Sequence, residues 1–229
     1  MYRYETHLHT FPVSKCARVG VREVLEFYKE AGYEGIFLTN HFIDGNINIE
    51  RSRPYEERIE FYFSDYEEAK KLEGEIGIKV FLGVEVSYQG IDFLVYGLDK
   101  EWFLAHPEIE TLTKKQQLAL YMDNGALVVQ AHPFRESGHI DHIHLFPRSI
   151  QGVEIVNANR TEFENKLAKQ YADNYGLVYF AGTDNHVGGA QKRFAGIETD
   201  TPLVDERDLI NRVLESRVGL FVINCEMPS

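Results

Sequence analysis

The sequence predicts an α/β fold in which short buried strands alternate with amphipathic helices. Two observations support this class. Brief apolar runs such as 35–39 and 177–181 have the length and composition of buried parallel strands. The segment 21–32 carries apolar residues at helical spacing and ends at Gly32, as helices commonly do. The chain of 229 residues contains no linker, low-complexity tract or internal repeat, so we expect one domain over residues 1–229.

Each further element is predicted from its apolar pattern and from the residues at its ends. The first strand begins at Tyr2, and Pro54 can start a helix that extends to about residue 75, because proline is tolerated in a first helical turn. Strands 79–86 and 91–98 are joined by a connection that is short enough for a hairpin. The remaining elements are helices over 111–124, 162–176 and 205–216, and strands over 126–131, 152–156 and 218–223.

The composition describes an acidic protein. Lys and Arg number 24 against 36 Asp and Glu, so the net charge is −12, which opposes binding to nucleic acid or to an anionic membrane. No apolar run reaches the length of about 18 residues that a spanning helix needs. We see no secretory signal and expect a cytoplasmic protein. Cys16 and Cys225 lie far apart in sequence and indicate no disulfide framework.

Side chains that can bind metal ions recur where the apolar strands end. His7 and His9 follow the first strand, and alternation along an extended segment places both imidazoles on one face. Such a pair alone is weak evidence, but the pattern recurs at four further strands. The carboxyl ends of parallel strands gather at one rim, so we expect a shared metal centre there. The candidate ligands are His7, His9, His41, Glu85, His132, Asp184 and His186.

Five ordered motifs give the chain a resemblance to the PHP (polymerase and histidinol phosphatase) family of metal-dependent phosphoesterases. The resemblance extends over residues 5–188 and implies a distorted (β/α)7 barrel with two or three divalent ions, commonly zinc, manganese or iron. The motifs are His7-Leu8-His9, Thr39-Asn40-His41, Gly83-Val84-Glu85, Gln130-Ala131-His132-Pro133-Phe134-Arg135 and Gly182-Thr183-Asp184-Asn185-His186.

The resemblance also implies how the ligands are shared among the ions. Glu85 would bridge the first ion to a second, which also binds His132, and His41 and His186 would belong to a third site. Asn40 replaces the aspartate that is usual before this histidine, and we expect its carbonyl oxygen to orient His41. The first ion would be bound by His7, His9, Glu85 and Asp184.

Two positions depart from the family's pattern. Members with three ions have a further histidine after the strand that here ends at 96–98, and none stands there, since His106 lies further on. They also have a histidine or aspartate in the first loop, where this chain has Ser-Lys-Cys at 14–16. Two ions are therefore an alternative to three. Cys16 is either a small, partly buried residue or a sulfur ligand, which would favour zinc.

The activity that the resemblance implies is hydrolysis of a small phosphate monoester, such as histidinol phosphate or a nucleotide. We expect direct attack by a hydroxide that bridges two cations, which also neutralise the phosphoryl oxygens. The candidate for protonating the leaving oxygen is His186 or another rim histidine. Arg135, Arg18 and Arg193 fall in predicted rim loops and are candidates for binding the phosphate, the alternative for each being a surface position.

Other functions remain open at this point. A metal-dependent amidohydrolase also begins with His-x-His in a barrel, but that class bridges its metals with a carboxylated lysine, where this chain has Glu85. A regulatory or binding domain with a depleted metal site is the third possibility. The loop 134–149 carries His139, His142 and His144, which belong either to an exposed loop or to a lid over the substrate. Nothing in the pattern predicts an oligomeric state.

Overall fold

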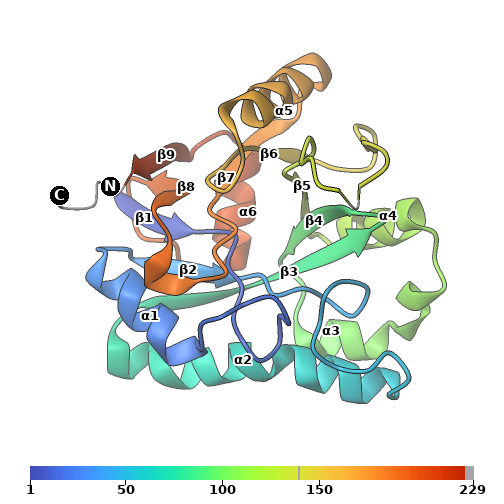
Figure 1. The fold of residues 1–229 in the computed structure, drawn as a ribbon, viewed down its shortest axis with the longest axis horizontal. Helices are drawn as coiled ribbons and strands as arrows, with labels where there is room; N and C mark the ends of the chain where they lie inside the picture. The colour runs from blue at the N-terminus through green and yellow to red at the C-terminus, as the bar shows by residue number, and fades with distance from the viewer. Residues whose placement is uncertain (139, 225–229) are drawn as a thin grey trace.

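The fold is known from a computed structural model that describes residues 1–138 and 140–224, so Cys225 and His139 lie outside the described residues. Its strands form one sheet in the order β7-β6-β5-β4-β3-β2-β1-β8-β9 (Figure 1). The strands are β1 (Tyr2–Glu5), β2 (Gly35–Leu38), β3 (Lys79–Tyr88), β4 (Ile91–Tyr96), β5 (Leu127–Ala131), β6 (Gly152–Asn157), β7 (Val178–Gly182), β8 (Arg193–Thr199) and β9 (Gly219–Asn224).

Helices cover the outside of this sheet. In Figure 1, α1 and α2 lie side by side next to β2 and β3, and α5 lies against β6. No helix among the described residues is both long enough and apolar enough to traverse a bilayer. The α-helices are α1 (Val21–Glu30), α2 (Tyr55–Ile76), α3 (Lys100–Ala105), α4 (Lys114–Asp123), α5 (Glu162–Tyr175) and α6 (Glu206–Leu214), and the 3-10 helices are η1 (Pro107–Glu110) and η2 (Gly188–Ala190).

The directions of the strands confirm the predicted distorted (β/α)7 barrel. β1, β2 and β3 are parallel neighbours, and so are β5, β6 and β7. β4 is antiparallel to β3 and β5, while β8 is antiparallel to β1 and β9. Seven strands therefore share one direction, and β4 and β8, which run against them, are the distortion.

The sheet curves until β7 approaches β1, which nearly closes the barrel. Just beyond these strands, Leu8 and Asn185 form a parallel bridge. Between β1 and β7 themselves a side chain makes the connection. Glu5 Oε1 accepts a hydrogen bond of 3.0 Å from the backbone N–H of Thr183, 178 residues away in sequence. The first and last motifs of the sequence thus become neighbours.

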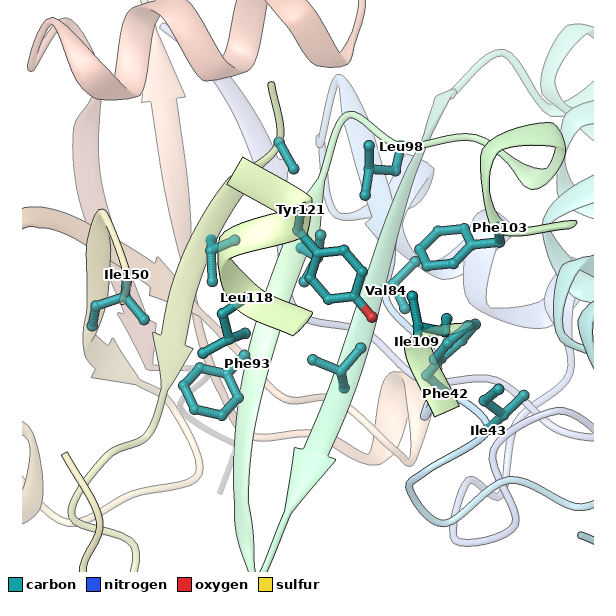
Figure 2. Packing of buried hydrophobic residues seen from close by; sticks show 14 of the residues in the cluster. Phe42, Ile43, Val84, Phe93, Leu98, Phe103, Ile109, Leu118, Tyr121 and Ile150 are labelled. Carbon is teal, nitrogen blue, oxygen red and sulfur yellow. The ribbon is translucent and has the colours of Figure 1, made fainter. Parts of the chain in front are cut away.

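The largest cluster of buried apolar residues fixes the β3–β4 hairpin. Figure 2 shows Leu118 and Tyr121 of α4 packed over the strands that carry Val84 and Phe93. Successive side chains of a strand point to opposite faces. Since Val84 faces this cluster, the next residue, Glu85, points into the barrel, where its side chain is fully buried.

Several element boundaries differ from the sequence prediction. The helix predicted over 111–124 begins only at Lys114, because Thr113 and Gln116 form a capping box there. α3 and β8 were not predicted at all. Arg193 therefore begins a strand rather than lying in a rim loop. β8 contains polar residues and a glycine, and pairing with β1 and β9 stabilises it in a way that its local pattern does not indicate.

Candidate metal centre

All seven predicted ligands lie together at the end of the barrel where the parallel strands stop. Five of them are buried, and the side chains of His41 and His186 are 12% and 24% exposed. Within each of three groups of side chains, the potential ligand atoms lie within 4.8 Å of one another. The groups are His7, His9 and Asp184; His7, Glu85 and His132; and His9, His41 and His186.

Two of these residues have an unusual backbone conformation. His132 follows β5 with a φ of 27°, and Asp184 follows β7 with a φ of 61°. Residues other than glycine seldom adopt positive φ, and such strain is concentrated at functional sites. The turns after β5 and β7 therefore direct these two side chains into the barrel at a cost in backbone energy.

A buried carboxylate that was not predicted from the sequence, Glu154, orients His7. The Nδ1 atom of His7 lies 3.0 Å from Glu154 Oε1, and its Nε2 atom lies 3.0 Å from Glu85 Oε1. Burial would lower the pKa of His7, but Glu154 and the other carboxylates raise it well above its usual value. Glu154 also accepts a hydrogen bond of 2.9 Å from the backbone N–H of His132. Its only signal in the sequence is a glutamate inside the apolar strand 153–156.

Ser14 in the first loop orients His9. Its Oγ atom lies 3.1 Å from His9 Nδ1 and donates a hydrogen bond of 2.8 Å to Asn40 Oδ1. We expected the side-chain oxygen of Asn40 to orient His41, and this was wrong. The oxygen instead accepts hydrogen bonds from the Ser14 hydroxyl and from the backbone N–H of Thr10. The backbone N–H of His41 donates to Ser14 Oγ. Burial and the nearby imidazoles of His186 and His41 hold the pKa of His9 well below its usual value.

Four buried ligand atoms in this centre form no hydrogen bond of suitable geometry, although two of them, His41 Nδ1 and Glu85 Oε2, lie 2.5 Å apart. Buried polar atoms in proteins are nearly always hydrogen-bonded, so a cluster of exceptions requires an explanation. Divalent ions would satisfy His9 Nε2, His132 Nε2 and Glu85 Oε2, and mixed nitrogen and oxygen ligands suit zinc, manganese or iron. The residues therefore fit a centre for more than one ion, while binding by each residue stays a prediction. The unpartnered atoms are His9 Nε2, His41 Nδ1, Glu85 Oε2 and His132 Nε2.

Two carboxylates of the centre have the charge that a metal site requires. Burial would raise the pKa of Glu85, but the imidazoles of His41 and His7 hold it well below its usual value. The pKa of Asp184 is also held well below its usual value, because His7 and His9 outweigh the effect of burial. Both carboxylates are thus ionised and available as ligands at neutral pH.

Asp92 is a further carboxylate of the centre that was not predicted. Its Oδ2 atom lies 3.8 Å from His132 Nε2, and burial, together with the charge of Glu85, raises its pKa. β4 is antiparallel, so its first residues lie at the rim and its end lies at the opposite side of the barrel. Asp92, rather than a residue after Tyr96, therefore approaches the second group. His106 is far from these contacts and stacks on Trp102.

The candidate catalytic residues lie at the rim. Arg135 contacts Asp92, with 3.5 Å between NH1 and Oδ2, and its buried Nε has no partner. His186 Nδ1 lies 3.0 Å from the backbone oxygen of Asp184. Arg18 is exposed and its backbone N–H donates to the His186 oxygen.

The other candidates lie outside the three groups of ligand atoms. The Arg193 guanidinium approaches the backbone oxygen of Arg160 at 3.5 Å. His142 is exposed and His144 is half-buried, which agrees with an exposed loop and does not test a role as a lid.

Comparison with solved structures identifies the fold. No family model and no curated protein matches the sequence. A two-domain protein from Bacteroides vulgatus, described as containing a predicted PHP-like metal-dependent phosphoesterase, superposes with a TM-score of 0.70 over 96% of this chain, at 13% identity. The chain has the PHP fold. It spans 64% of the length of that two-domain chain.

Two further structures share the PHP fold along almost their whole length. One is a candidate metal-dependent phosphoesterase from Bifidobacterium adolescentis, with a TM-score of 0.56, 13% identity, and coverage of 93% of this chain and 96% of that one. The other is an amidohydrolase from Chromobacterium violaceum with bound sulfate and no metal, with a TM-score of 0.56, 16% identity, and coverage of 94% and 97%. The PHP fold is thus shared by proteins described as two kinds of hydrolase.

Proposed function

We propose that this protein is a metal-dependent phosphoesterase that hydrolyses a phosphate monoester of a small metabolite. One observation carries the proposal: buried ligand nitrogens without hydrogen-bond partners, His9 Nε2 and His132 Nε2, converge at the end of a PHP barrel among ionised carboxylates. Bound divalent ions supply a nucleophile from water at neutral pH and neutralise the charge on the phosphoryl oxygens. The protein supplies the positions of the ligands and the groups that contact the substrate.

Hydrogen bonds to the Nδ1 atoms of His7 and His9 fix the orientation of these two candidate ligands. Glu154 binds Nδ1 of His7 and Ser14 binds Nδ1 of His9, so the Nε2 lone pair of each ring points toward the centre. Partners of this kind fix the tautomer and orientation of metal-binding imidazoles. These hydrogen bonds therefore orient the Nε2 atoms of His7 and His9 for metal binding.

Two rim residues have the chemistry to act on the substrate. Arg135 has a partly exposed guanidinium that contacts Asp92 and the Gly90 backbone oxygen at 3.5 and 3.3 Å, and a guanidinium suits the oxygens of a phosphoryl group. His186 is the most exposed imidazole among the seven candidate ligands, and it is the proposed group for protonating the leaving oxygen when its Nε2 carries a proton rather than an ion. A metabolite resembling histidinol phosphate, or a nucleotide, is the proposed substrate class, while the charge of −12 disfavours a nucleic acid.

Metal analysis and a phosphatase assay test this function directly. Protein purified without chelator should contain divalent ions and should hydrolyse an aryl phosphate such as p-nitrophenyl phosphate. His9→Ala and Asp184→Ala should abolish this activity and retain the circular dichroism spectrum, whereas His106→Ala, which removes a histidine far from the centre, should leave the activity intact. Absence of bound metal together with absence of activity after adding manganese or zinc would refute the proposal. A screen of phosphorylated metabolites then identifies the substrate.

An amidohydrolase is the second candidate, because a protein so described shares the fold. Amidohydrolases bridge their metals with a carboxylated lysine, but the bridging position here has Glu85. The buried Lys114 does not take that role, because its ammonium donates to Asp44 and Gln117. The same metal-loaded protein should be assayed with a panel of amides. Hydrolysis of an amide without hydrolysis of any phosphate ester would favour this candidate.

A further inference from the structure

Cys16 lies against the outer edge of the metal centre. Its Sγ atom is 3.2 Å from His41 Nε2, and His186 is near enough that the two imidazoles together lower the pKa of the thiol against the effect of burial. The residue is exposed and comes from the loop between β1 and α1. It is thus reachable from solvent on one side and touches two imidazoles on the other.

The δ nitrogens of both imidazoles face oxygen atoms of the centre. His41 Nδ1 lies 2.5 Å from Glu85 Oε2, and His186 Nδ1 lies 3.0 Å from the backbone oxygen of Asp184. Since the δ nitrogens face oxygen atoms of the centre, the ε nitrogens are left to bind a ligand beside the thiol.

A second observation that does not involve the thiol also indicates an ion here. His9, His41 and His186 form one of the groups whose ligand atoms lie within 4.8 Å of one another. The Nε2 atom of His9, whose side chain is fully buried, has no hydrogen-bond partner. An unpartnered buried nitrogen in a cluster of three imidazoles is what a metal site without its ion would contain.

Backbone hydrogen bonds hold the loop that carries the thiol. Lys15 N–H donates to the Asn46 oxygen at 3.0 Å, and Arg18 N–H donates to the His186 oxygen at 2.8 Å. The residues on both sides of Cys16 are therefore tied to the loops that carry His41 and His186. The approach of the sulfur to the imidazoles is built into the fold and does not depend on a free rotation of the loop.

We infer that Cys16 is a metal ligand, which with Nε2 of His41 and His186 forms a third ion site at the mouth of the centre. A thiolate with two imidazoles prefers zinc or cobalt to manganese, and three protein ligands leave one position open. The inference rests on the metal centre of the proposed function, but it does not require phosphatase activity. It makes the centre one for three ions, with one site distinguished by sulfur.

Cobalt(II) binding tests the inference by spectroscopy. Metal-stripped protein is titrated with cobalt(II), and the near-ultraviolet band of sulfur-to-cobalt charge transfer is recorded. The band should be present in the wild-type protein, lost in Cys16→Ser and retained in Cys225→Ser, the matched control for the other cysteine. Zinc analysis should find one ion fewer per chain in Cys16→Ser than in Cys225→Ser. Circular dichroism checks that the variants fold, which exposure of Cys16 leads us to expect.

The contrary outcomes separate this inference from the proposed function. Cobalt that binds without the charge-transfer band, or a band that persists in Cys16→Ser, overturns the role of Cys16 and leaves the remaining centre in place. Protein that binds no cobalt overturns the metal centre itself, and with it the proposed function. A second measurement uses alkylation by iodoacetamide: zinc should slow alkylation of Cys16, and an equal rate with and without zinc contradicts coordination.

Discussion

Replacing Glu154 by glutamine tests whether this buried carboxylate positions the metal ligands. Glu154 Oε1 faces His7 Nδ1, while Oε2 accepts from the His132 N–H and from Asn157 Nδ2, each at 2.9 Å. Glutamine keeps the shape but has a single acceptor oxygen. Its amide group must therefore meet at least one of these donors, whichever way the side chain is turned.

The cost of this mismatch can be estimated from the contacts. A buried donor without an acceptor costs ~1–3 kcal/mol of stability. Loss of a partner that orients a ligand lowers metal affinity about 10- to 100-fold, which is about 1.4–2.8 kcal/mol. We expect Glu154→Gln to fold and to bind zinc more weakly by this factor, as measured by competition with a chromophoric chelator.

The control for this experiment is Glu162→Gln, because Glu162 is an exposed residue in the first turn of α5. It should bind zinc like the wild-type protein. Equal zinc affinity in the Glu154 and Glu162 variants, with both correctly folded, would refute the idea that Glu154 orients His7 and His132.

Three further predictions concern the same centre. In Gly182→Ala the added Cβ would lie 2.5 Å from His7 Cβ, so His7 must move, and zinc affinity should fall in the chelator competition; an unchanged affinity would show that the site tolerates the shift. Arg135→Lys removes the guanidinium fork, and the KM for an aryl phosphate should rise about tenfold, the effect of one charge-assisted hydrogen bond, whereas an unaltered KM would place Arg135 outside the substrate site. Removing the ions with a chelator should lower Tm, since a ligand at about 100 times its Kd stabilises the folded protein by about 2.7 kcal/mol. An equal Tm with and without chelator would contradict a metal centre that is occupied in the native protein.

The alternation of strands and helices could be predicted because both periods are visible in the sequence. The strand ends at His9, His41, His132 and Asp184 carry polar residues directly after apolar runs, and the fold brings them to one rim as expected. β8 could not be predicted, because its stability comes from neighbours on both sides rather than from its own pattern.

The parts of the site that were not predicted depend on chain direction and on packing. A hairpin reverses the chain, so the beginning of β4 reaches the rim and Asp92 enters the centre. Glu154 is visible only as a charged residue in an apolar strand, a pattern that does not reveal which atom it will contact. Ser14 and Cys16 lie in a loop whose course is set by hydrogen bonds to distant segments, so their roles became visible only in three dimensions.

The gap between β1 and β7 gives the ions a mechanical role in addition to a chemical one. On one side of the gap stand His7 and His9, and on the other stands Asp184, while the strands themselves are joined there through Glu5 and a short bridge beyond them. An ion bound to all three residues would cross-link the two sides of the gap and stabilise the closed barrel. Backbone hydrogen bonds from the Asp184 N–H to the His7 oxygen and from the His9 N–H to the Asn185 oxygen already join the two segments, so a bound ion would reinforce a closure that the chain itself makes.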